Sequence, residues 1–95
     1  MNITEDQARE LMHEWVESES LRGHMEAVAA AMAFHAKKVA PDDIERWTIA
    51  GLLHDFDYEK HPTTEEHPFV GIAHLKERND VDDEIIDAIL GHALY

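Results

Sequence analysis

Histidine and carboxylate side chains are the groups in this sequence that could hold a metal ion. The chain has eight histidines and no cysteine, which excludes disulfides and thiolate metal sites. The clearest signal is the pair His54–Asp55, which ends an apolar segment of helical periodicity. At a helix end the imidazole can bind one ion while the carboxylate bridges to a second, as two-metal hydrolytic centres require. We therefore predict that His54 and Asp55 are the catalytic residues of a hydrolytic metal centre.

Two other histidines are predicted to point into a helical bundle. His24 follows Leu21 by three residues and precedes Val28 by four, so the helical period places its imidazole in the same buried seam as those apolar side chains. His92 has an equivalent relation to Ile89 on a later helix. A single inward histidine is more often a hydrogen-bonded core residue than a ligand. Two of them on separate helices favour a shared site.

A further candidate ligand lies at a predicted junction between a loop and a helix. Pro68 suits the first position of a helix and leaves His67 at the cap, where its side chain is free of the packing of the helix. Gly71, one turn later, removes bulk where a helix can approach a metal site. We expect His67 to be a ligand and His74 to lie behind the ligands or on the surface. The remaining histidines are predicted to have ordinary positions: His13, His35 and His61.

The elements that would position these residues are all helical. Five segments show helical periodicity, and no window shows the sustained alternation of a strand. Asn79 and Asp80 separate the last two helices, and residues 56–66 form the one long predicted loop. The predicted fold class is all-α. Capping residues mark the expected helix starts, namely Thr4 for the first helix, Ser18 and Ser20 before a second helix over about 21–39, and Asp42 with Glu45 for the third.

Composition limits the partners and the location of the protein. Lys and Arg total 8 against 21 Asp and Glu, and the formal charge of −13 argues against non-specific nucleic-acid binding because it repels phosphate backbones. No apolar run approaches the roughly 20 residues needed to span a bilayer, and no secretory signal pattern is present. We expect one cytoplasmic domain over residues 1–95 without a membrane partner. Because natural chain ends are more often polar, the apolar ending Gly91–Tyr95 leads us to expect that the chain is the N-terminal part of a longer domain.

Four segments of the sequence together resemble the HD-domain superfamily, most closely its small HDIG-type members. In chain order these segments are Leu21–Ala29, Gly51–Tyr58, His67–Ala73 and Ile86–His92. The resemblance spans residues 21–95 and implies an HD-like bundle of about five helices. Where the family motif has His-Asp-Ile-Gly, this chain has His-Asp-Phe-Asp at residues 54–57.

The resemblance implies two neighbouring metal sites that share one aspartate. Mixed imidazole and carboxylate ligation suits one or two divalent ions of Fe, Mn, Co, Ni or Zn. A later aspartate that completes the first site in the family has no counterpart here, because neither Asp57 nor Asp87 follows His92. Carried over by motif, the ligands of the first site are His24, His54 and Asp55, and those of the second are Asp55, His67 and His92.

The activity that the resemblance implies is metal-dependent hydrolysis of a small phosphorylated substrate, such as a nucleotide. Arg22 or Lys60 would be a candidate partner for the phosphate. Two alternatives stay open. One is a di-iron oxygenase of the same superfamily, and the other is a non-catalytic regulatory or interaction module of HD-like fold.

An apolar patch is expected to make the chain a homodimer. If covering helices are absent, a contiguous patch stays exposed, which monomers rarely tolerate, and a two-fold axis would bury it. The formal charge of −13 opposes association only weakly once salt screens it. The side chains expected in this patch are Trp15, Ile89, Leu94 and Tyr95.

Overall fold

The computed structural model describes residues 3–60, 67 and 69–92, with side chains described as far as Ile89. This part of the chain forms five α-helices and one short 3-10 helix, and it contains no strand. The elements are α1 (Glu5–Trp15), α2 (Glu19–Val39), η1 (Pro41–Asp43), α3 (Ile44–Leu53), α4 (Phe69–Arg78) and α5 (Asp83–His92). The predicted all-α class with about five helices is confirmed.

The first two helices begin at side-chain caps. The predicted cap at Thr4 is confirmed. The Thr4 hydroxyl accepts the Gln7 N–H, and the Gln7 side chain accepts the Thr4 N–H, which together form a capping box. The Ser18 hydroxyl accepts the Leu21 N–H, and α2 therefore starts at Glu19, two residues before its predicted start.

The predicted cap of α3 was wrong. Residues Pro41–Asp43 form η1, and α3 then starts at Ile44 without a side-chain cap. Glu45 does not reach back to this helix end, because its carboxylate accepts the Glu5 N–H of α1 at 3.3 Å. Glu45 therefore makes a tertiary contact with α1 and does not cap α3 as predicted.

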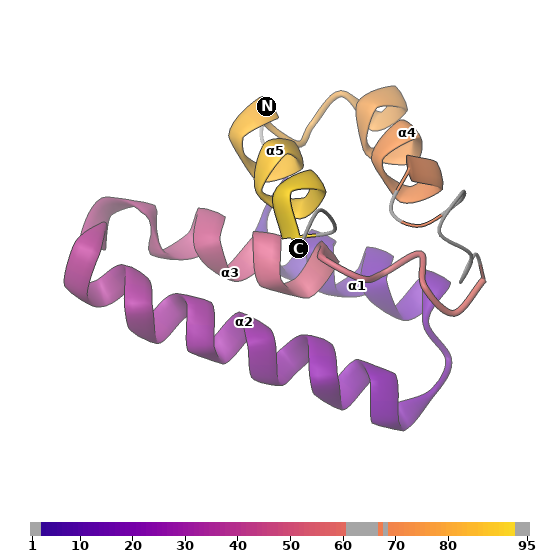
Figure 1. The fold of residues 1–95 in the computed structure, drawn as a ribbon, viewed down its shortest axis with the longest axis horizontal. Helices are drawn as coiled ribbons and strands as arrows, with labels where there is room; N and C mark the ends of the chain where they lie inside the picture. The colour runs from indigo at the N-terminus through magenta and orange to yellow at the C-terminus, as the bar shows by residue number, and fades with distance from the viewer. Residues whose placement is uncertain (1–2, 61–66, 68, 93–95) are drawn as a thin grey trace.

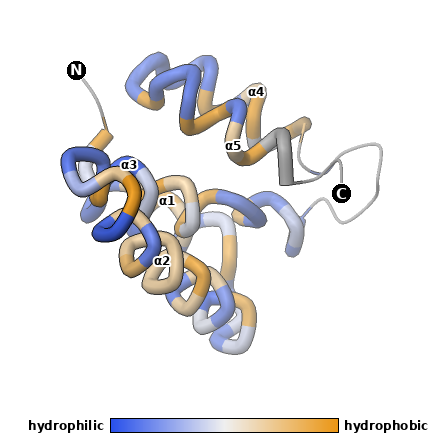
Figure 2. The backbone as a smooth tube through the Cα atoms, turned by 60° about the vertical axis from the view of Figure 1, so that its left-hand side comes forward, coloured by the Kyte–Doolittle hydropathy of each residue, from blue (hydrophilic) through white to orange (hydrophobic). Residues whose placement is uncertain are grey.

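Helix α3 is the centre of the fold because it packs against α1, α2 and α5. Figure 1 shows α2 and α3 running side by side, and both views place α4 and α5 together on one side of them (Figures 1 and 2). Every residue of α3 from Thr48 to Leu53 is buried. The buried Thr48 hydroxyl has a hydrogen-bond partner, because it donates to the Ile44 carbonyl at 2.8 Å.

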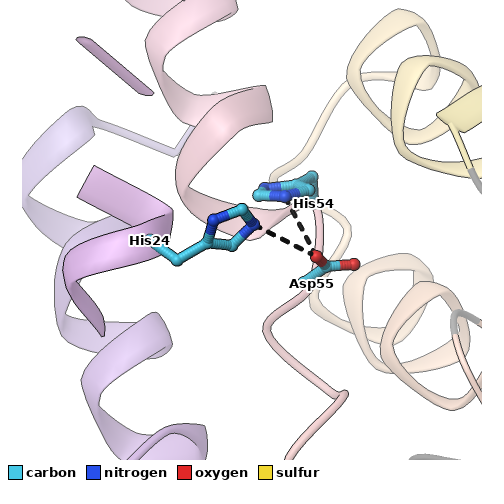
Figure 3. Close-up of side chains that lie close together, drawn as sticks. All are labelled: His24, His54 and Asp55. Atoms are coloured by element: carbon cyan, nitrogen blue, oxygen red, sulfur yellow. Dashed lines mark ion pairs between the residues drawn. The ribbon is translucent and has the colours of Figure 1, made fainter. Parts of the chain in front are cut away.

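A glycine lets α2 and α3 approach closely. A Cβ atom added to Gly51 would lie 2.6 Å from the Cα of Ala29, so no larger residue fits without moving a backbone. This contact turns the buried face of α2 toward α3, with Met25, Ala29 and Ala36 buried. It also places the C-terminal end of α3, and with it His54, beside the first half of α2 (Figure 3).

The α4–α5 pair is held to the rest by polar contacts as well as by the core. Asn79 follows the last residue of α4 and has a φ of 59°, the left-handed conformation that often ends a helix. The predicted break between the last two helices is therefore confirmed. The Ile3 N–H donates to the Asp80 carbonyl at 2.5 Å. Arg46 of α3 contacts Asp82 at 3.0 Å and Glu84 at 2.8 Å, at the start of α5.

The predicted exposed apolar patch was wrong for the side chains that the structure describes. Ile89 is buried, because α5 crosses α3 and turns this residue into the core. Trp15 is half-buried, with its ring 4.9 Å from that of Phe56. Leu94 and Tyr95 lie outside the described residues. The large apolar side chains that are exposed in the described part are Phe34, Val39, Tyr58 and Phe69.

Within the described ranges, no helix has both the length and the apolar character needed to cross a lipid bilayer. Even α2, the longest of them at 21 residues, has charged residues at its start and its end.

Candidate metal centre

Asp55 lies among three histidines that come from different parts of the chain. Its Oδ2 atom is 3.0 Å from Nε2 of His54 and 3.7 Å from Nε2 of His24. Its Oδ1 atom is 3.1 Å from Nε2 of His67, the residue two positions before α4. Figure 3 shows the imidazoles of His24 and His54 directed at the Asp55 carboxylate. The two oxygens of Asp55 thus face different partners.

These separations suit ligands that share a divalent cation. Imidazole and carboxylate bonds to such ions are about 2.0–2.2 Å long, so two ligand atoms on one ion lie about 3.0–3.4 Å apart. The ligand atoms of His24, His54 and Asp55 all lie within 4.8 Å of one another. The residues present therefore fit a metal, and His67 extends the cluster on the other oxygen of Asp55.

The ring of His54 is fixed by the helix that it terminates. Its Nδ1 atom lies 2.6 Å from the carbonyl oxygen of Gly51, which can only accept, so Nδ1 carries the proton and Nε2 faces Asp55. Burial by itself lowers the pKa of His54, but hydrogen bonds to Asp55 and to the Gly51 carbonyl outweigh it, so this pKa lies above its ordinary value. The arrangement presents a defined nitrogen to the site.

The prediction that His24 points into a buried seam was wrong. Its side chain is 52% exposed, at the open edge of the cluster, with its ring 5.3 Å from that of His54. The buried seam of α2 contains Met25 and Ala29 instead, because the close contact of Ala29 with Gly51 sets the rotation of the helix. His24 is one residue away from that seam and is directed sideways toward Asp55.

Asp57 is a site residue whose position sequence reasoning missed. It is 1% exposed, and its carboxylate lies between Nδ1 of His67 and the backbone N–H of Gly71. From the sequence, Asp57 was predicted only to be a poor replacement for the missing later aspartate. The signal that could have found it is the carboxylate at the fourth position of the His-Asp-Phe-Asp segment, where the related motif has glycine.

Of the two remaining histidine candidates, one lies outside the described side chains and the other packs against an aromatic ring. His92 ends α5, but its side chain is not among those described, so its predicted role as a ligand stays a prediction. His74 is half-buried against Trp15, with 5.0 Å between the ring centroids.

Neither basic residue considered as a phosphate partner is directed at the cluster. Arg22 donates to the Val16 carbonyl at 2.5 Å and to the His13 carbonyl at 2.9 Å. These acceptors belong to the end of α1, where carbonyls lack partners within the helix. Lys60 places its ammonium group 5.4 Å from the centre of the Trp15 ring.

A depression of about 380 Å³ lies next to the cluster. It is adjacent to the site because Tyr58, in its wall, contacts His67 edge-on with 5.4 Å between the ring centroids. Its lining combines hydroxyl groups with one carboxylate and one aliphatic side chain: Ser18, Ser20, Leu21, Tyr58 and Glu59.

Comparison with protein families found one match that covers most of the chain. A family model described as "HD domain" matches residues 21–94, a range that includes His24, His54, Asp55 and His67. Comparison with curated proteins and with solved structures found no significant match.

Proposed function

Since the chain belongs to the HD domain family, we propose that it is a metal-dependent phosphohydrolase that acts on a small phosphate ester. The observation that carries the proposal is the position of Asp55, whose two oxygens face His54 and His67 at 3.0 and 3.1 Å. A carboxylate in this position can serve two ions at once, as two-metal hydrolases require.

The ligand set defines what the centre would bind. His24, His54 and Asp55 would hold one divalent ion, and Asp55 with His67 would hold a second, completed by His92 as the family motif implies. The mixture of nitrogen and oxygen ligands suits Fe, Mn, Co, Ni or Zn. When bound, such ions polarise phosphoryl oxygens and lower the pKa of water. The chain's own part is to orient these ligands, through the Gly51 carbonyl for His54 and through Asp57 for His67.

Charge makes the proposed substrate binding dependent on metal. The chain has a formal charge of −13, which repels a phosphate group. Arg22 is committed to the carbonyls of α1 and does not offset this repulsion at the cluster. Two divalent cations would reverse the sign of the local potential. We therefore expect phosphate esters to bind the metal-loaded protein and not the metal-free one.

The depression beside the cluster would receive the rest of the substrate. Hydroxyl groups of Ser18, Ser20 and Tyr58 line it, and they can exchange hydrogen bonds with polar groups such as the hydroxyls of a sugar. Glu59, also in the lining, accepts the Glu17 N–H at 2.7 Å and so supports the connection between α1 and α2. The exposed surface of this lining is mostly apolar, so the depression would accept a substrate that presents both a polar and an apolar part.

The test is hydrolysis by protein reconstituted with one metal at a time. Metal-free protein would be loaded with Mn, Fe, Co, Ni or Zn and offered p-nitrophenyl phosphate, bis(p-nitrophenyl) phosphate and nucleoside monophosphates. We expect metal-dependent release of product that is lost in His54→Ala and kept in His13→Ala, a control in which an exposed histidine of α1 is removed. Retained metal without hydrolysis of any substrate would contradict the proposal.

One observation favours a second candidate, a non-catalytic module. In the part of the chain that the structure describes, the group formed by His24, His54 and Asp55 contains no second carboxylate. The later aspartate that completes this site in the family has no counterpart in the sequence, so the site has one ligand fewer than the family motif implies. Failure of the purified protein to retain any divalent metal would favour this alternative. An iron-loaded protein with a redox-dependent absorption spectrum would instead favour an oxygenase.

A further inference from the structure

Asp57 is a buried carboxylate whose two oxygens both have hydrogen-bond partners. Its Oδ2 atom accepts the Gly71 N–H at 2.9 Å, and its Oδ1 atom lies 2.5 Å from Nδ1 of His67. A buried carboxylate is tolerated when it is hydrogen-bonded in this way. These contacts fix the carboxylate between His67 and the first turn of α4.

Gly71 makes this placement possible. A Cβ atom added there would lie 3.0 Å from both Cγ and Oδ2 of Asp57 and 2.7 Å from a ring carbon of Phe56. Only a residue without a side chain lets α4 come close enough for its backbone N–H to reach the carboxylate. The backbone of α4 therefore fixes the Oδ2 atom of Asp57 and leaves its Oδ1 atom facing His67.

His67 has both of its ring nitrogens directed at carboxylate oxygens. Nδ1 faces Asp57, and Nε2 faces Oδ1 of Asp55 at 3.1 Å. A neutral imidazole has one N–H and can donate to only one of them. Asp57 is the closer and the more buried acceptor, so Nδ1 carries the proton and the lone pair of Nε2 faces Asp55. His67 Nε2 and Asp55 Oδ1 would together hold a cation, whose positive charge would stabilise that arrangement.

His54 is oriented in the same way, by an acceptor at its Nδ1 atom. There the Gly51 carbonyl accepts the Nδ1–H and leaves Nε2 facing Oδ2 of Asp55. Histidines that bind metals are commonly oriented by such outer acceptors, which select the tautomer and the ring plane. The two histidines on either side of Asp55 are thus aligned in parallel ways, one by a carbonyl and the other by a carboxylate.

We propose that Asp57 is a positioning residue that fixes His67 as the Nδ1–H tautomer and presents its Nε2 atom, together with Asp55, to a divalent cation. The part about the cation rests on the proposed function, whereas the part about the tautomer does not. The carboxylate at this position distinguishes the chain from the His-Asp-Ile-Gly pattern and gives the second half of the centre its own orienting group.

The variant Asp57→Asn tests this role with little change of shape. The Gly71 N–H can only donate, so the amide oxygen of the new side chain must face it. The amide NH₂ then faces Nδ1 of His67, which must accept, and the proton moves to Nε2. The ring would change tautomer and lose the lone pair that a metal needs.

The measurement is long-range ¹H–¹⁵N correlation of the imidazole rings in the full, metal-free chain at pH 8. We expect the Nδ1–H tautomer for His67 in the wild type and the Nε2–H tautomer in Asp57→Asn, with His54 unchanged in both as an internal control. Asp42→Asn, at an exposed position of η1, is the matched control and should leave both rings unchanged. A neutral wild-type His67 ring that carries its proton on Nε2 would overturn the proposal, even if the variant did not fold.

Calorimetric titration with Mn²⁺ alone gives a second readout. Loss of an outer partner of a metal-binding histidine typically weakens binding by about 10–100-fold, and we expect a loss of this size for Asp57→Asn and none for Asp42→Asn. Equal Mn²⁺ affinity in Asp57→Asn and wild type would contradict the proposed role. If the wild type bound no metal, the proposed function would fail, while the tautomer of His67 would still decide the role of Asp57.

Discussion

The Nε2 atom of His67 lies 3.1 Å from Oδ1 of Asp55, and these residues are 12 positions apart in the sequence. The other oxygen of Asp55 faces His24 and His54. One carboxylate therefore connects ligands from α2, from the end of α3 and from the approach to α4. The proposed chemistry depends on this connection more than on any single histidine.

Asp55→Ala should remove metal binding more completely than loss of any one histidine. The substitution takes a ligand from both proposed ions and removes negative charge that balances them. Elemental analysis after dialysis against Mn²⁺ is the measurement, with His54→Ala for comparison and Asp42→Asn as the exposed control. A metal stoichiometry that is unchanged in Asp55→Ala would contradict the bridging role.

His24→Ala should separate metal binding from stability. The side chain of His24 is 52% exposed, so its removal should change the free energy of unfolding of the metal-free protein by less than about 0.5 kcal/mol. Metal affinity should nevertheless fall. Chemical denaturation and Mn²⁺ titration of the same preparation measure the two effects. A large loss of stability with unchanged Mn²⁺ affinity would show that His24 stabilises the fold and does not bind metal.

Two glycines of the helical part should respond to alanine in opposite directions. Gly51→Ala forces a Cβ atom to within 2.6 Å of the Ala29 backbone and should destabilise the fold by about 1–3 kcal/mol or more. Gly23→Ala has nothing within 4 Å of the new atom and lies inside α2, so it should stabilise the fold by about 0.5–1 kcal/mol. Urea denaturation measures the free energy of unfolding of both variants. Equal changes in the two would show that α2 and α3 do not approach closely at Gly51.

The ion pair between α1 and α2 should make stability depend on pH in the acidic range. Hydrogen bonds at 2.7 and 2.9 Å from the Arg9 guanidinium hold the pKa of Glu26 below its ordinary value, although burial acts in the opposite direction. Because the folded pKa is the lower one, the stabilisation is present above the unfolded pKa of about 4.3 and is lost as pH falls through the folded pKa.

Glu26→Gln should therefore cost stability near neutral pH and little in acid. Both side chains are about a third exposed, so we expect a loss of only about 0.5–1 kcal/mol at pH 7. Denaturation curves of wild type and Glu26→Gln between pH 3 and 7 measure the difference, with Glu10→Gln as an exposed control. A difference that stayed constant over this range would show that the charge of Glu26 is not its source.

Local sequence signals predicted the helices and the pair at the end of α3. Caps such as Thr4 and Ser18 act within a few residues, and helical periodicity is equally local, so they can be recognised without tertiary information. His54–Asp55 was predictable for the same reason, since its position depends on where one apolar helix ends.

What could not be predicted depends on how helices meet. The exposure of His24 follows from the rotation of α2 that the contact of Gly51 with Ala29 imposes. The burial of Ile89 follows from α5 crossing α3. The role of Asp57 requires α4 to bring the Gly71 N–H beside it. The sequence indicated a close approach at Gly71, but not that Asp57 is the side chain it meets.

Anomalous X-ray scattering from crystals of the Mn²⁺-loaded protein tests the central claim most directly. The claim predicts an anomalous peak about 2.0–2.2 Å from Oδ2 of Asp55 and Nε2 of His54, with His24 on the same ion, and a second peak between Oδ1 of Asp55 and Nε2 of His67. Crystals of His54→Ala should lose the first peak. Manganese bound only at other acidic positions, with Asp55 making no contact to an ion, would contradict the account.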